Sequence, residues 1–184
     1  MSSELKTNKV SPATGTALQI GDSGDTITIP SGATLTNSGS ATGFGKVLQT
    51  VSASYATTEI TTSLTYVDTS LTAAITPASS SNKILIWVTS AWFTSHASNP
   101  AAYARIYNST DTVELATTYT EAYDADSSGW MIYHGMPCSI IAEDTGRSIA
   151  TTYKLQHRAA ASGRNSKLQN ENNKAFIILM EIAA

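Results

Sequence analysis

From Lys46 onward, apolar residues recur at every second position, in short runs separated by turn-forming residues. In the last run, residues 175–182, four apolar residues share one face: Phe176, Ile178, Met180 and Ile182. Side chains alternate between the two faces of a β-strand, so a period of two predicts strands, whereas a helix has a period of 3.6. No stretch of useful length has the helical period. The sequence therefore predicts an all-β fold.

Composition agrees with this prediction. Ser and Thr together account for 51 of the 184 residues, and Thr is mixed with Val, Ile and Tyr along the predicted strands. β-Branched and aromatic residues favour strands. Further strands are expected at residues 47–55, 71–76, 83–93, 104–108, 113–118, 130–136, 140–142 and 149–155.

About eight strands with frequent turns are typical of a two-sheet sandwich, and we expect an antiparallel, jelly-roll-like one. Residues 83–93 are the most apolar, which predicts a central strand covered on both faces. Pro137 interrupts a later run and predicts an edge strand or a bulge.

Residues 1–45 differ from the rest because they contain little that can pack. Their alternating aliphatic residues predict short, extended β segments with one thin apolar stripe: Leu18, Ile20, Ile27, Ile29 and Leu35. Turns are expected at residues 21–25 and 30–32. One thin stripe cannot bury enough surface in a single chain. We therefore expect a 1–45 segment that assembles with other chains and a 46–184 β-sandwich domain.

Several classes of protein are disfavoured. The longest apolar runs, residues 84–88 and 176–180, are far shorter than a membrane-spanning helix, so no membrane insertion is expected. A net charge of −3 gives no general attraction to nucleic acid. The polar first residues predict that the protein is not secreted. Cys138 is the single cysteine, so the chain has no disulfide framework.

The sequence shows no catalytic motif. The three histidines, His96, His134 and His157, are far apart, and phosphate-loop and nucleophile-elbow patterns are absent. Asp124 and Asp126 partly resemble a calcium loop, but Gly135 stands where the loop needs Glu. We expect a protein that is not an enzyme and binds no cofactor or metal, with Asp124 and Asp126 as weak metal candidates.

Nine of the 14 aromatic residues fall between Trp87 and Tyr133. Aromatic rings at the ends of loops stack on sugars or contact a protein partner. The residues expected to face a receptor include two polar ones from the 160–174 loop: Trp92, Tyr103, Tyr119, Tyr123, Trp130, Arg164 and Asn165. The alternative is that the rings close the ends of the sandwich or fill an interface between subunits.

Residues 6–12 (KTNKVSP), 21–35 (GDSGDTITIPSGATL) and 43–45 (GFG) resemble the N-terminal segment of tail-fibre and other virion structural proteins of marine bacteriophages. The C-terminal part is similar through residues 83–85, 151–158 and the closing strand. The resemblance implies a homotrimer without enzymatic activity. It also implies that the apolar stripe of residues 1–45 serves docking to the particle and trimerisation.

Two functions follow from this resemblance. The first is a trimeric tail fibre that recognises a glycan or protein on the host cell surface. The alternative is a capsid decoration or head-fibre protein with a purely structural role. Both place the protein in the virion, in contact with other virion proteins, after synthesis in the host cytoplasm. A glycan depolymerase is disfavoured because neither a long β-helix nor paired carboxylates are visible.

Overall fold

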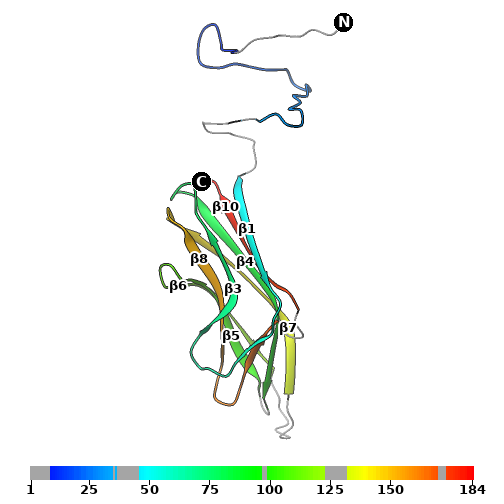
Figure 1. Ribbon diagram of the computed structural model, residues 1–184, viewed down its shortest axis with the longest axis vertical. Helices are drawn as coiled ribbons and strands as arrows, with labels where there is room; N and C mark the ends of the chain where they lie inside the picture. Colours follow the sequence, from blue (N-terminus) through cyan, green and yellow to red (C-terminus); the bar gives the residue numbers. More distant parts are fainter. Residues whose placement is uncertain (1–8, 35, 37–45, 97–98, 123–131, 170–172) are drawn as a thin grey trace. The chain divides into compact units, whose positions relative to one another are not determined.

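The computed structural model describes residues 9–34, 36, 46–96, 99–122, 132–169 and 173–184. The chain divides into two compact units, Met1–Phe44 and Gly45–Ala184. The described residues contain no helix, and about 56% of them lie in strands, all in antiparallel sheets (Figure 1). The predicted all-β class is confirmed.

The described part of the first unit, residues 9–34 and 36, forms turns but no strand. The two expected turns are present: Asp25 N donates to Asp22 O, and Ala33 N donates to Pro30 O, both at 3.1 Å. The expected short β segments are absent. A strand needs a second strand to pair its backbone groups, and the single chain supplies none here. Leu35 lies outside the described residues, and the other stripe residues are 44–65% exposed: Leu18, Ile20, Ile27 and Ile29.

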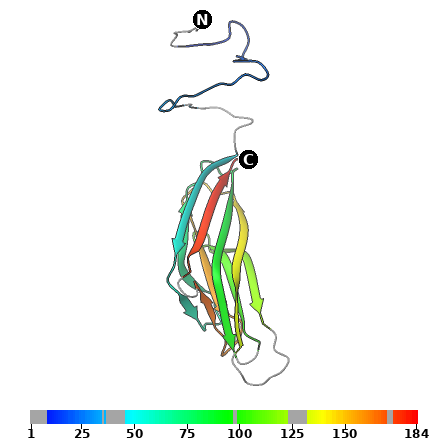
Figure 2. The same ribbon diagram turned by 90° about the vertical axis from the view of Figure 1, so that its right-hand side faces the viewer.

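The second unit contains a six-stranded and a four-stranded sheet. The strands of the six-stranded sheet are β1 (Val47–Tyr55), β10 (Ala175–Ile182), β4 (Lys83–His96), β7 (Ile132–Thr145), β9 (Ser166–Leu168) and β2 (Glu59–Thr61). Those of the four-stranded sheet are, in order, β3 (Val67–Ile75), β8 (Thr151–Ala159), β5 (Ala101–Asn108) and β6 (Val113–Glu121). Figure 2 shows β1, β10, β4 and β7 side by side in one layer.

The core lies between the two sheets. One face of β3, β4, β5, β8 and β10 is buried, in the alternating pattern that the sequence predicted. The largest buried apolar side chains come from both sheets: Ile84, Ile86, Ile177 and Leu179 from the first, and Leu71, Ile106, Tyr153 and Leu155 from the second. The second unit is therefore an all-β sandwich.

Three of the predicted strand features can be compared directly. β10 has the predicted bounds. Pro137 lies in β7, which pairs only with β4 and is an edge strand, as expected. The prediction for β4 is wrong in one respect, because the single chain covers only one of its faces and Trp87 is 41% exposed on the other.

A buried carboxylate holds the C-terminal strand. Glu181 is fully buried and accepts hydrogen bonds from Asn82 Nδ2 and Gln49 Nε2, both at 2.6 Å, and from Ala78 N at 2.7 Å. Burial alone raises the pKa of Glu181, but these hydrogen bonds outweigh it and the pKa is lowered. The charged form is thus matched by neutral donors, which tie β10 to β1 and to the turn before β4.

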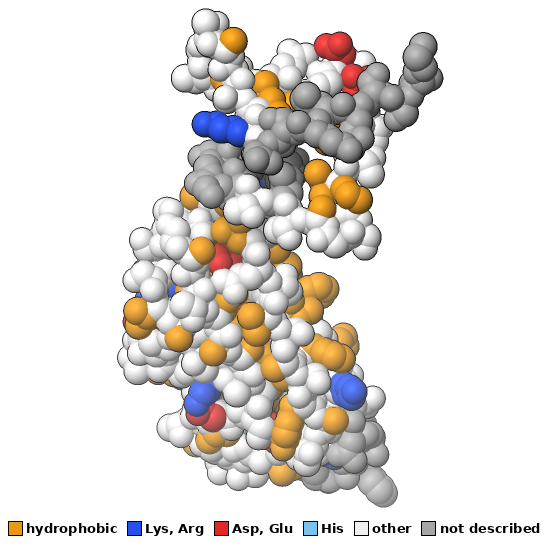
Figure 3. Space-filling model, turned by 45° about the horizontal axis from the view of Figure 1, so that its top comes forward, with side chains coloured by type: hydrophobic (Ala, Val, Ile, Leu, Met, Phe, Trp, Pro, Cys, Tyr) orange, Lys and Arg blue, Asp and Glu red, His pale blue; other side chains and the backbone are white. Residues whose placement is uncertain are grey.

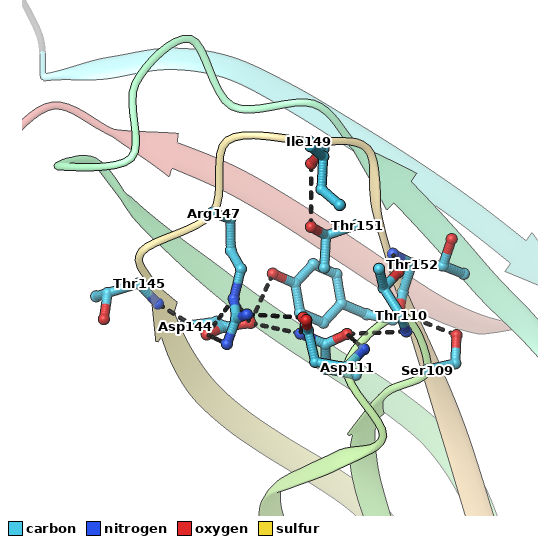
Figure 4. Close-up of polar contacts among 11 residues, drawn as sticks. Ser109, Thr110, Asp111, Asp144, Thr145, Arg147, Ile149, Thr151 and Thr152 are labelled. Atoms are coloured by element: carbon cyan, nitrogen blue, oxygen red, sulfur yellow. Dashed lines mark hydrogen bonds and ion pairs between the residues drawn. The ribbon is translucent and has the colours of Figure 1, made fainter.

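A second buried carboxylate joins the two sheets (Figure 4). Asp144 on β7 accepts hydrogen bonds from Asn108 Nδ2 at 2.9 Å and Tyr153 OH at 3.0 Å, both from the four-stranded sheet. Arg147 bonds it with Nε and Nη2 and reaches Asp111 through Nη1 at 2.7 Å. Burial raises the pKa of Asp144, and the hydrogen bonds from Arg147, Tyr153 and Asn108 lower it further than burial raises it. This fully bonded cluster is a structural link between the layers.

His157 on β8 belongs to a third buried link. Its Nδ1 lies 3.0 Å from Ser166 Oγ, and the same hydroxyl accepts a hydrogen bond from Trp92 Nε1 at 3.0 Å. Ser166 Oγ therefore bridges the side chains of Trp92 and His157. Burial lowers the pKa of His157 to about 4, so the ring is neutral at pH 7.

We predict that His157 makes stability depend on pH between about 6.5 and 4. The unfolded histidine titrates near its ordinary pKa of about 6.5 and the folded one near 4, so the unfolded state binds the proton first as pH falls. The free energy of unfolding should fall across this window by up to about 3 kcal/mol. Urea unfolding at pH 7, 5.5 and 4 measures it. His157→Gln should remove this part of the slope, and identical slopes in both proteins would contradict the assignment.

Candidate recognition face

The outer face of the four-stranded sheet gathers four tyrosine rings and two arginines. We call this set the tyrosine–arginine face: Tyr66, Tyr103, Arg105, Tyr107, Tyr119 and Arg158. Three of its members alternate along β5 and so point to the same side. Strand register brings two more members next to them, since Tyr103 is paired with Tyr119 on β6 and with Arg158 on β8.

Rings and guanidinium groups alternate across this face. The Cζ of Arg158 lies 3.9 Å from the ring centroid of Tyr103 and 5.2 Å from that of Tyr66. The Cζ of Arg105 lies 3.9 Å from the Tyr66 centroid and 4.6 Å from that of Tyr107. The rings of Tyr103 and Tyr119 are 4.6 Å apart and tilted by 43°. These cation–π and ring contacts hold the side chains in place before any ligand arrives.

Polar groups complete the surface around the rings. Arg105 donates from Nε to Gln156 Oε1 at 2.7 Å and from Nη1 to Glu114 Oε2 at 2.8 Å. Hydrogen bonds from Gln156 and Lys154 lower the pKa of Asp68, so its carboxylate is charged at neutral pH. The face therefore presents flat rings together with fixed donors and acceptors.

Arg158 differs from Arg105 in its partners. Its Nη1 donates to the Ala159 carbonyl oxygen at 3.1 Å, and within the described part of the chain no carboxylate pairs with it. Tyr119, on the other side of Tyr103 from Arg158, is 42% exposed. A guanidinium without an anionic partner, on the same face as an accessible ring, suits a ligand that offers both a flat face and oxygen acceptors.

The structure brings together some of the residues that the sequence singled out. Tyr103 and Tyr119 are in contact, and Arg164 is near enough to act on the Tyr119 hydroxyl. Burial and Glu121 raise the pKa of Tyr119, while Arg164 opposes them. The sequence reasoning missed four members of the face: Tyr66, Arg105, Tyr107 and Arg158. Two of them, Arg105 and Tyr107, could have been found from the sequence, because they alternate with Tyr103 along one strand and so share its face.

Two residues expected to face a receptor are structural instead. Trp92 is 2% exposed and bonds to Ser166, because β4 continues to His96 and Trp92 lies within the strand rather than next to a loop. Asn165 holds the end of β4: its Nδ2 donates to Ser95 Oγ at 2.7 Å, and its carbonyl oxygen accepts from Thr94 Oγ1 at 2.6 Å. Tyr123 and Trp130 lie outside the described residues.

The structure offers no support for a metal site among the residues it describes, where no three His, Cys, Asp or Glu side chains come together. The weak candidates Asp124 and Asp126 lie outside that part. Burial raises the pKa of Cys138 to about 12, which keeps its thiol protonated. No helix in the described ranges is long and apolar enough to cross a membrane.

Comparison with protein families and with curated proteins returns no match for this chain.

We predict that Trp92 and Tyr119 differ sharply in their contribution to stability. Trp92→Ala should lower the free energy of unfolding by about 3–5 kcal/mol, because it empties a core position and leaves Ser166 without its donor. Tyr119→Ala should cost about 1 kcal/mol or less, since the ring is partly exposed. Chemical denaturation measures both. A small loss for Trp92→Ala would mean that Trp92 is not part of the core.

Proposed function

We propose that this protein is a bacteriophage virion structural protein, a homotrimeric tail fibre that recognises the surface of the host cell. The observation that carries the proposal is the tyrosine–arginine face. Tyrosine rings in contact with fixed arginines resemble the surfaces that proteins use to bind sugars and other flat ligands.

The strand order supports a jelly roll. When the eight long strands are taken in chain order, the first pairs with the last (β1 with β10) and the second with the seventh (β3 with β8). The third pairs with the sixth (β4 with β7) and the fourth with the fifth (β5 with β6). A hairpin of this kind rolls up into the jelly roll found in viral capsid and lectin domains. A fold indicates a class of protein and does not identify a ligand.

The Met1–Phe44 unit supports a docking role. Its stripe residues Leu18, Ile20, Ile27 and Ile29 are exposed in the single chain, and aliphatic side chains at regular intervals suit burial against another protein. In this proposal the unit attaches the trimer to neighbouring virion proteins, and the sandwich carries the recognition surface outward. Three equivalent faces on one trimer bind a repetitive surface more strongly than one.

The same exposed stripe also favours a second candidate function, a capsid decoration or head-fibre protein. Aliphatic residues spread from Val10 to Ile29, without secondary structure among them in the described residues, fit a chain laid over the surface of other virion proteins. Antibody labelling of particles in electron micrographs separates the two locations.

The ligand that fits the face best is a cell-surface glycan. Sugar rings stack on tyrosine, and their hydroxyl and carboxylate oxygens accept hydrogen bonds from guanidinium groups. A protein receptor is the other possibility, and treatment of the host cells distinguishes the two. Periodate oxidises sugars, whereas protease removes surface proteins.

We predict that Arg158→Ala and Tyr119→Ala each weaken binding of the labelled full-length protein to host cells by about five- to thirtyfold, because each removes a contact worth roughly 1–2 kcal/mol. Lys46→Ala is the matched control, since Lys46 is an exposed cation just before β1 of the other sheet. Flow cytometry measures binding, which periodate but not protease should abolish. Unchanged binding by both face variants would contradict a recognition role for this face.

A further inference from the structure

The outer face of the six-stranded sheet is apolar along its middle. Strand register places Ile178 and Ile141 on either side of Trp87, and Met180 beside Leu85. We call this surface the apolar face: Leu85, Trp87, Ile141, Phe176, Ile178 and Met180. Three of these side chains are well exposed, Trp87 at 41%, Phe176 at 42% and Ile141 at 61%. Figure 3 shows hydrophobic side chains projecting along the side of the second unit where this sheet lies.

This surface has the composition of a buried layer. Residues 84–88 and 176–180 are apolar at every position, so β4 and β10 carry apolar side chains on both faces. Such continuous runs are typical of strands that are covered on both sides. Within the second unit the four-stranded sheet covers one side, and no described strand covers the other.

The apolar face is broad enough to form the centre of a subunit interface. Its residues come from three strands, β4, β7 and β10, and three strands spaced by about 4.8 Å, each about eight residues long at 3.4 Å per residue, give a flat area of roughly 400 Å². The largest apolar patch on a typical monomer is about 300–600 Å², and is often functional. A standard interface buries about 800 Å² of accessible surface on each partner. That value follows the contours of the side chains and includes the polar rim, so it is larger than the flat area of the same patch. The sheet is large enough to supply such an interface.

We propose that the apolar face is the contact between copies of this chain. The inference rests on the homotrimeric assembly proposed above and names the surface that forms it. The tyrosine–arginine face on the opposite sheet then stays open to solvent in the assembly.

Charge favours a copy of the chain as the partner. The centre of the face carries no charged side chain, as in the core of a protein interface. Its rim carries both signs: Lys83 and Glu143 form an ion pair at 3.2 Å and are more than half exposed, and Lys167 lies over the Phe93 ring at 5.7 Å. A rim with both signs matches another copy of itself, whereas a partner of one dominant charge would meet repulsion.

Light scattering on the full-length protein tests the proposal, with Ile141→Lys as the central variant. Ile149→Lys is the matched control, because Ile149 is also 61% exposed but lies between β7 and β8, away from this face. The wild type and Ile149→Lys should have about three times the chain mass of 19.4 kDa, and Ile141→Lys should have the mass of one chain. Phe176→Ser should also dissociate the assembly. Because it adds no charge, it tests the same face even if Ile141→Lys fails to fold.

The outcomes separate this inference from the proposed function. A wild type with the mass of one chain overturns both the trimer and the assigned contact. An assembled wild type whose mass is unchanged by both Ile141→Lys and Phe176→Ser overturns only the contact. If Ile20→Lys loses assembly while the two face variants remain assembled, the assigned contact is also overturned. The contact between copies then belongs to the Met1–Phe44 unit.

Discussion

Insertion of β10 between β1 and β4 is the pairing on which the rest of the structure depends. It places the buried side chains of β10 against the four-stranded sheet and joins the start of the sandwich to its end. The bonded carboxylate of Glu181 makes this register specific, because a slip by one residue would turn that charge outward and bury an apolar side chain in its place. The same insertion brings the outward residues of β10 beside those of β4 and so creates the apolar face.

The two sheets share one core but differ on their outer faces. Successive side chains of a strand point to opposite faces, so the residues of the outer face can differ between the sheets while those of the inner face form one core. On the four-stranded sheet the outer positions carry tyrosine, arginine and ion pairs, which suit a surface that is exposed to solvent and binds a ligand reversibly. On the six-stranded sheet they carry aliphatic and aromatic groups, which suit permanent burial. We infer that the two outer faces have different functions: the six-stranded sheet forms the contact between subunits, and the four-stranded sheet recognises the ligand.

Alternation predicted the class of fold and the bounds of β10, and Pro137 predicted an edge strand or a bulge where β7 is an edge strand. Alternation missed β2 and β9, whose three residues are too few to show a period. It predicted strands at Leu18–Ile20 and Ile27–Ile29 that the single chain does not pair. Trp92 was expected next to a loop, at the end of the strand 83–93, but β4 continues three residues further, to His96. The tyrosine–arginine face depends on which residues of β5, β6 and β8 stand opposite each other, and strand register is not visible in a sequence.

Hydroxyl-radical footprinting of the assembled protein tests these two functions most directly, because one experiment reports on both outer faces. The account predicts that Trp87, Ile141, Phe176 and Met180 are protected at concentrations where the protein is assembled and react when it is diluted. Tyr103 and Tyr119 should react equally in both conditions. Protection of the tyrosines, with Trp87 and Met180 fully reactive in the assembly, would contradict the account and assign the subunit contact to the opposite sheet.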